Sequence, residues 1–189
     1  MQKLRNTSDV VLNDIVQYNE KLRKYNWGFV HKGKILSDTE SDMFELYRTI
    51  SPARFHQYET GVCWDYVSAE TEWFLDMGFD ITMNELRDET FSQYYIEYQD
   101  GEKNPTHTWI SFQYNERIYI FEASWTKYFG IYRFNSEMSM VKTYSSLWMK
   151  NGRYKHCAVY KYPQFKHFNL IPEDFMLDIK IHGNKILEI

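Results

Sequence analysis

Two neighbouring stretches, Thr106–Tyr114 and Ile118–Ser124, alternate side chains with the two-residue period of β-strands. They follow each other so closely along the chain that they predict a hairpin. A loop of two or four residues would pair Phe112 with Tyr119 and keep the apolar faces together. A three-residue loop would turn one strand over and scramble that pairing. The hydrophobic pattern therefore favours one register.

The same register has a chemical consequence on the other face of the hairpin. It sets Glu122 opposite Trp109 and diagonal to His107, so that a carboxylate can reach an imidazole. Taken alone, His107 could be a solvated residue at a strand end, and Glu122 a solvated strand carboxylate. The pairing predicted by the register gives the two a joint role.

A cysteine lies upstream, at the start of a predicted helix. The segment Gly61–Tyr66 opens an amphipathic pattern that continues to Gly78, and Ser51-Pro52 begins a shorter helix before it. We expect Gly61 to provide a permissive turn between the two helices. Cys63 then falls in a first helical turn, where free N–H groups stabilise a thiolate. The alternative is that Cys63 is a small packing residue.

Cys63, His107 and Glu122 together meet the requirements of nucleophilic catalysis. A reactive thiol needs a base within hydrogen-bond reach, and that base needs a third group to hold its tautomer and orientation. The chain order of cysteine, histidine and acid is that of papain-like thiol enzymes. We therefore expect Cys63 and His107 to be in contact, with Cys63 partly accessible.

The segments Gly61–Asp65, Thr106–Ile110 and Tyr119–Trp125 resemble the transglutaminase-like superfamily, in which a cysteine opens a core helix and a histidine and an acid lie on adjacent strands. The resemblance covers roughly residues 45–135, and the fuller pattern resembles an uncharacterised branch of Gram-positive bacteria and their mobile elements. Glu122 stands where aspartate is commoner. The resemblance implies an α+β, papain-like cysteine protease fold, with a helical N-terminal half carrying the nucleophile on a core helix packed on an antiparallel sheet.

Three further residues are candidates for substrate contact. Trp64 follows the cysteine and could wall a cleft, although a packed core aromatic is the alternative. Trp109 belongs to the histidine motif. Gln57 precedes Cys63 by six residues, a spacing that suits an oxyanion donor, or it is simply an exposed helix residue. Asp65 suits the first helical turn, and we expect its carboxylate to point away from Cys63.

The remaining chain predicts a helix after Thr7-Ser8 that ends near Tyr25. Helices are also expected over 136–150 and from Pro172, with strands near 158–162 and 186–187, a connection with some helical character at 84–88 and a loop over 100–105. Cys157 reads as a buried, inert strand thiol. No linker divides the chain, so residues 1–189 are expected to form a single transglutaminase-like domain.

Composition excludes several classes of function. The formal net charge is −4 and the basic residues do not cluster, which argues against a nucleic-acid partner. No apolar run approaches the ~20 residues that span a membrane. With 2 cysteines and no signal-peptide pattern at the start of the sequence, we expect a reduced, cytoplasmic protein. Metal-binding and phosphate-loop motifs are lacking, so neither a metal nor a cofactor is expected.

The sequence thus predicts acyl transfer at an amide bond through a Cys63 thioester, with His107 as acid and base and Glu122 orienting it. Peptidase, amidase, deamidase and transglutaminase-type reactions share this first step and stay open, as does the oligomeric state. The many aromatic residues suit a polypeptide substrate. The alternative function is a catalytically inactive transglutaminase-like module that binds another protein.

Overall fold

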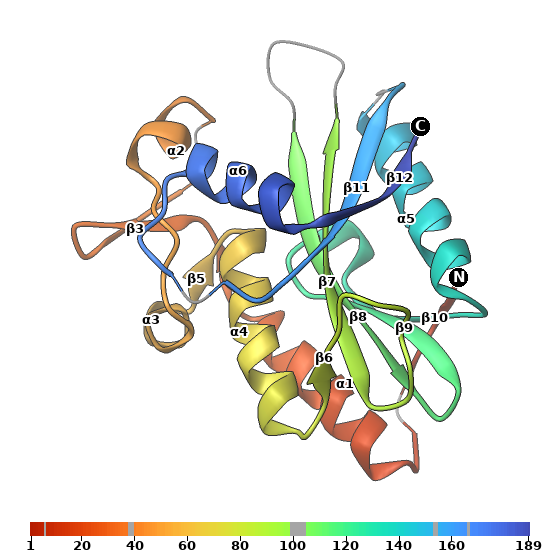
Figure 1. The fold of residues 1–189 in the computed structure, drawn as a ribbon. Helices are drawn as coiled ribbons and strands as arrows, with labels where there is room; N and C mark the ends of the chain where they lie inside the picture. The colour runs from red at the N-terminus through yellow and green to blue at the C-terminus, as the bar shows by residue number, and fades with distance from the viewer. Residues whose placement is uncertain (6, 38–39, 99–104, 153–154, 166) are drawn as a thin grey trace.

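The computed structural model describes residues 1–5, 7–37, 40–98, 105–152, 155–165 and 167–189. It has a mixed α+β fold built on one eight-stranded sheet, as expected at that level, with helices on both faces (Figure 1). The helices are α1 (Val10–Leu22), α2 (Glu40–Leu46), α3 (Pro52–Tyr58), α4 (Cys63–Asp76), α5 (Glu137–Gly152) and α6 (Pro172–His182), with a 3₁₀ turn at Thr126–Tyr128.

The sheet runs in the order β1-β10-β9-β8-β7-β11-β12, with antiparallel neighbours, and a short parallel strand, β6, pairs with β7. These strands are β1 (Gln2–Lys3), β6 (Asp80–Ile81), β7 (Thr90–Tyr98), β8 (Thr106–Tyr114), β9 (Arg117–Glu122), β10 (Gly130–Phe134), β11 (Cys157–Tyr162) and β12 (Asn184–Glu188). Two small sheets pair β2 (Asn26–Trp27) with β5 (Thr60–Gly61), and β3 (Phe29–His31) with β4 (Lys34–Leu36).

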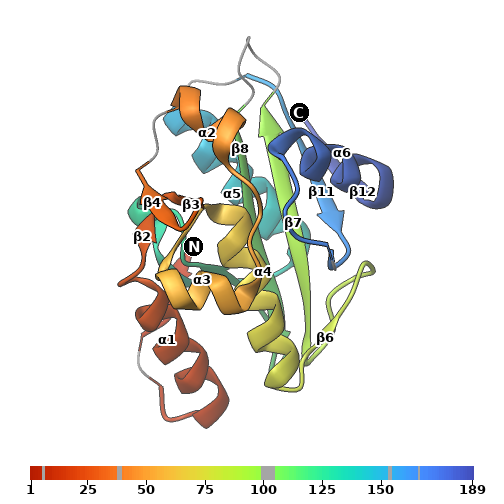
Figure 2. The ribbon, with the colours of Figure 1, turned by 90° about the vertical axis from the view of Figure 1, so that its left-hand side faces the viewer.

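Helices bury both faces of the central strands. In Figure 1 the sheet stands between α4 on one side and α5 on the other, and Figure 2 shows the same layers from the side. Phe74 of α4 packs against Phe91, Phe112 and Phe121 of three neighbouring strands. A second apolar cluster on the α5 face includes Trp109. Both sides of β8 are therefore core.

The hairpin of β8 and β9 has the register that the hydrophobic pattern predicts. Phe112 pairs with Tyr119 and Ile110 with Phe121, while Tyr114 faces Arg117 across a two-residue turn. Phe112 and Tyr119 also stack, with ring centroids 5.0 Å apart. The register carries Glu122 to the end of β9, beside the first residues of β8.

The helix starts follow local capping chemistry. Ser51 caps α3 and Pro52 occupies its first turn, as expected. The cap of α1 is Asp9, whose carboxylate accepts the Leu12 N–H at 3.0 Å, rather than the expected Thr7-Ser8. The helix ends at Leu22, three residues before the predicted boundary.

Glycine is required at position 61 because a side chain would not fit there, and not because the chain turns at this point. It lies in β5, and a Cβ there would be 2.7 Å from the Phe55 ring and 2.8 Å from the Asp65 Cβ. The close approach lets Asp65 reach backward, where its carboxylate accepts hydrogen bonds from the Val62 N–H at 3.0 Å and the Tyr47 hydroxyl at 2.8 Å. These bonds fix the segment that leads into Cys63.

The C-terminal elements lie close to their predicted positions, since α5, β11, α6 and β12 all cover the expected segments. The expected helical character at 84–88 is replaced by bends and turns. Most of the predicted 100–105 loop lies outside the described residues. No helix within the described ranges is both long and apolar enough to cross a membrane.

Candidate active site

Three elements bring the predicted catalytic residues together. Cys63 is the first residue of α4, His107 is the second residue of β8, and Glu122 is the last residue of β9. The His107 Nε2 lies 2.8 Å from the Glu122 Oε2, and the Cys63 side chain forms a hydrogen bond with His107. Since Nε2 faces the carboxylate, Nδ1 is the nitrogen that remains for the thiol.

Hydrogen-bond donors surround the Glu122 carboxylate. Its Oε1 accepts the Ser124 N–H at 2.9 Å, the Ser124 hydroxyl at 3.1 Å and the Trp125 N–H at 2.7 Å. Its Oε2 accepts from His107 and from the Tyr144 hydroxyl. Burial raises the pKa of Glu122, but the charge of His107 and these hydrogen bonds outweigh it and hold the pKa below its ordinary value. Glu122 is therefore a buried carboxylate with a fixed orientation.

The same pair keeps His107 protonated. Burial alone lowers the pKa of the imidazole, but the Glu122 carboxylate and the hydrogen bonds to Cys63 and Glu122 raise it to about 10. At neutral pH His107 is thus an imidazolium, able to donate from both nitrogens. Nε2 donates a hydrogen bond to Glu122, and Nδ1 remains to bond the Cys63 side chain.

The thiol is more enclosed than the sequence predicts. Cys63 is 6% exposed, and the His107 and Glu122 side chains are 3% and 1% exposed. The expectation of a partly accessible Cys63 is therefore wrong for this structure. The first turn of α4 packs against its neighbours, as the apolar pattern of the helix requires. Any molecule that reaches the sulfur must displace some of these side chains.

Tyr144 is a site residue that the sequence does not reveal. Its hydroxyl, on α5, donates to the Glu122 Oε2 and lies 3.5 Å from the His107 Nε2. Tyr144 lies in the helix layer on the other side of the sheet from α4. No pattern in the sequence relates its position to that of Glu122. Tyr144 therefore closes the site from the α5 face.

Glu70 is a second residue missed from the sequence. It lies two helical turns after Cys63 on the same face of α4 and is 2% exposed. Burial and the nearby charge of Glu122 raise the pKa of Glu70 well above its ordinary value. A carboxyl group seven residues after the cysteine is a signal that helical periodicity could have found.

The expected substrate-contacting residues do not gather at the thiol. Trp109 is 1% exposed and packs in the core against Tyr94 and Tyr144, because α5 covers the face on which it lies. Gln57 is exposed on α3. Neither placement supports a substrate role.

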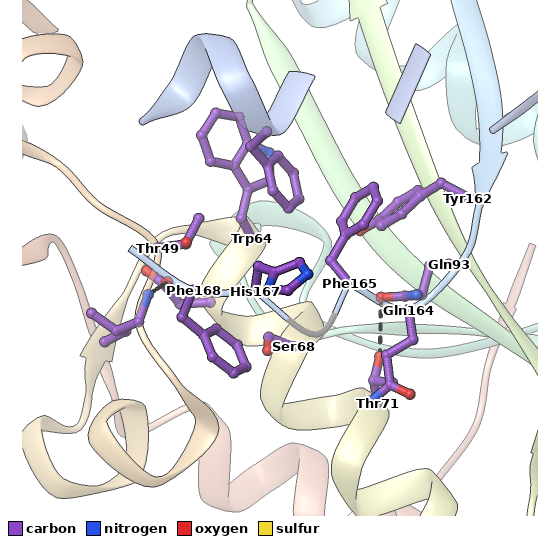
Figure 3. Close-up of a pocket in the computed structure, with 13 residues that line it drawn as sticks. Thr49, Trp64, Ser68, Thr71, Gln93, Tyr162, Gln164, Phe165, His167 and Phe168 are labelled. Carbon is purple, nitrogen blue, oxygen red and sulfur yellow. Dashed lines mark hydrogen bonds between the residues drawn. The ribbon is translucent and has the colours of Figure 1, made fainter. Parts of the chain in front are cut away.

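Trp64 and Asp65 occupy distinct structural positions beside the nucleophile. Trp64 packs on Phe175 of α6, with ring centroids 4.6 Å apart, and lines a pocket (Figure 3). Asp65 is held by Val62, Ile50 and Tyr47, so its carboxylate is engaged away from the thiol, as expected. Burial raises the pKa of Asp65 to about 7, although these hydrogen bonds oppose the shift.

The second cysteine differs from the first. Cys157 begins β11, is 1% exposed, and its pKa is raised by burial. It therefore matches the expected buried strand thiol. Within the described ranges, no group of three or more His, Cys, Asp or Glu side chains could hold a metal ion.

Comparison with models of known protein families finds no match, and comparison with curated proteins finds no similar sequence. The resemblance to the transglutaminase-like superfamily therefore rests on the motifs around Cys63, His107 and Glu122.

The His107–Glu122 pair predicts a pH-dependent contribution to stability. His107 has a folded pKa above its ordinary 6.5, so its contribution is complete below that pH and is lost as the pH rises toward about 10. Glu122 has a lowered pKa, so its contribution is complete above its ordinary 4.5 and is lost at lower pH. The free energies of unfolding of the wild type and of His107→Gln, measured with urea, should therefore differ most between pH 4.5 and pH 6.5.

We expect this difference to shrink by at least about 1.4 kcal/mol, the equivalent of one pKa unit, when the pH is raised from 6.5 to 10. Exposed Glu85→Gln serves as the control and should show no comparable trend. A difference that stays constant over this range would contradict the protonation of His107.

Proposed function

We propose that the protein is a thiol acyl-transfer enzyme of the transglutaminase-like superfamily, acting on an amide bond of a polypeptide. The single observation that carries the proposal is the hydrogen-bonded chain from Cys63 through His107 to Glu122. The roles required by this chemistry fall on three residues that are far apart in sequence. Hydrolysis and transfer to an amine both remain within the proposal.

The geometry supports a definite order of proton transfers. The proposed reacting species is a Cys63 thiolate that faces the protonated His107 at the start of α4. The thiolate attacks the amide carbonyl carbon and forms the C–S bond, while His107 gives its Nδ1 proton to the departing amine as the C–N bond breaks. The products of this step are a thioester on Cys63 and a neutral imidazole.

The second half-reaction regenerates the enzyme. Neutral His107 takes a proton from water or from an incoming amine, which attacks the thioester carbonyl and releases Cys63 as thiolate. Glu122 keeps Nδ1 turned toward the sulfur throughout and stabilises the positive charge whenever the ring is protonated. Tyr144 holds the Glu122 Oε2 and acts as a positioning residue.

One observation favours a second candidate, a non-catalytic module that binds another protein. Cys63 and the His107 side chain are both almost fully enclosed, at 6% and 3% exposure. In a module of this kind, the Cys63–His107–Glu122 network would fix the fold rather than react.

Cysteine reactivity distinguishes the two candidates. Cys63 and Cys157 are both buried, so exposure alone predicts slow alkylation of each. If His107 activates Cys63, iodoacetamide at neutral pH should label Cys63 at least about tenfold faster than Cys157 in the native protein. Peptide mass spectrometry measures both rates. His107→Gln should remove the advantage of Cys63 and leave Cys157 unchanged, and equal slow labelling of both thiols would favour the binding module.

Replacing the carboxylate tests the role of Glu122. In Glu122→Gln, the side-chain oxygen can still accept from Ser124 and Trp125, but the amide cannot balance the charge of His107. We expect Cys63 alkylation to slow by roughly 10- to 1,000-fold, at or below the range of a positioned acid or base. The melting temperature should also fall, because the neutral amide leaves the buried charge of His107 without its opposite charge.

Tyr144→Phe is the matched variant, since it removes one hydrogen bond to the carboxylate and keeps its charge. It should slow alkylation less than Glu122→Gln does. If Glu122→Gln lowers the melting temperature but leaves the alkylation rate unchanged, Glu122 is a structural residue and does not belong to the site.

A further inference from the structure

Three arginines that are far apart in the sequence come together near the β1 edge of the large sheet. Arg133 of β10 pairs directly with Tyr119 of β9. Arg117 lies two residues before Tyr119 on β9, so the two arginines are diagonal neighbours on the same face of the sheet. Arg5 follows β1, in which Gln2 pairs with Arg133. We call these three arginines the arginine surface.

The arginine surface borders a hollow of about 750 Å³. Arg5, Tyr119 and Arg133 line the hollow together with the hydroxyl-bearing Thr7 and Ser8, and no acidic residue is among the described residues of the lining. Burial raises the pKa of Tyr119, and the charges of Arg133 and Arg117 oppose that rise, so both guanidinium groups act on the same ring. The hollow therefore has a positively charged wall.

The three arginines are exposed, and no ion pair within the described ranges engages them. The acidic residue whose charge also acts on Tyr119 is Asp9. Its Oδ1 accepts the Leu12 N–H at 3.0 Å and its Oδ2 accepts the Asn115 side-chain amide at 3.2 Å. Asp9 thus caps α1 and holds the β8–β9 turn, which leaves the guanidinium groups accessible to a ligand.

The spacing of the arginines indicates which anion fits. A guanidinium group binds a carboxylate through two parallel hydrogen bonds. Diagonal neighbours such as Arg117 and Arg133 have Cα atoms about 7–8 Å apart. Alternate residues of an extended peptide lie about 7 Å apart and point to the same side. Carboxylates on alternate residues of such a peptide can therefore meet both arginines. The hollow is also far larger than one small anion needs, since pockets of about 300–1,000 Å³ hold whole small molecules.

We propose that the arginine surface binds an acidic segment of another polypeptide, in an extended conformation, with carboxylates on alternate residues. The chain as a whole has a formal net charge of −4, so it does not attract an acidic peptide non-specifically, and the attraction is confined to this surface. The proposed contact involves none of Cys63, His107 and Glu122, and it goes beyond the proposed function.

Fluorescence anisotropy with a labelled peptide of three glutamates alternating with serines tests the proposal. We expect saturable binding that weakens when the salt concentration rises from about 20 to about 200 mM, because the charges are exposed and screening shortens their reach. The same peptide with glutamine in place of glutamate should not bind. A peptide with three consecutive glutamates should bind more weakly, since neighbouring side chains of an extended chain point to opposite sides.

Variants locate the contact. Arg117→Gln and Arg133→Gln should each weaken binding about two- to fivefold, the range for an exposed ion pair, and the double variant should weaken it further. Both positions are exposed, so the melting temperature should not change. Arg54→Gln, at an exposed position on α3, removes the same charge elsewhere and should leave binding unchanged. Cys63→Ala should also bind as the wild type does, which keeps this result separate from the alkylation experiment.

Several results would overturn the proposal. They are an absence of saturable binding, equal binding by the double arginine variant, an equal loss in Arg54→Gln, and equal binding of the glutamine or consecutive-glutamate peptide. An oligothymidylate of equal charge that binds more tightly through the same arginines would assign the surface to nucleic acid instead. Inorganic phosphate that displaces the peptide more than potassium chloride does at equal ionic strength would indicate a site for a single small anion.

Discussion

The charged pair of His107 and Glu122 is the interaction on which the candidate site depends. An ion pair removed from water loses hydration, and the loss is recovered only when hydrogen bonds satisfy the remaining lone pairs and protons. Here backbone N–H groups, a serine hydroxyl and Tyr144 complete the shell of the carboxylate. The hairpin register, the turn after β9 and the packing of α5 are all needed for that shell. Disturbing any of them would disturb the imidazole that faces Cys63.

Enclosure has opposite effects on reactivity and access. A low-dielectric surrounding strengthens the attraction between His107, Glu122 and the thiol. It also hides the sulfur, so a substrate of the proposed enzyme would have to displace side chains near the first turn of α4.

Much of this arrangement could be predicted from local patterns. The alternation in β8 and β9 set the register because a one-residue slip would expose every apolar side chain, and the register then placed Glu122 near His107. The alternation failed for Trp109, because helices cover both faces of β8 and the polar face is buried as well. Tyr144 was not predictable, since its contact with Glu122 depends on how α5 packs across the sheet. Glu70 could have been found from its helical spacing to Cys63.

The protonation state of His107 tests the central claim most directly. Side-chain ¹⁵N NMR of the imidazole at pH 7.5, assigned through His107→Gln, distinguishes an imidazolium from either neutral tautomer. The account predicts that both nitrogens are protonated at this pH and that Cys63→Ala changes the Nδ1 resonance, because Nδ1 donates to the sulfur. A neutral ring that titrates near 6.5 and does not respond to Cys63→Ala would show that the three residues do not form one site.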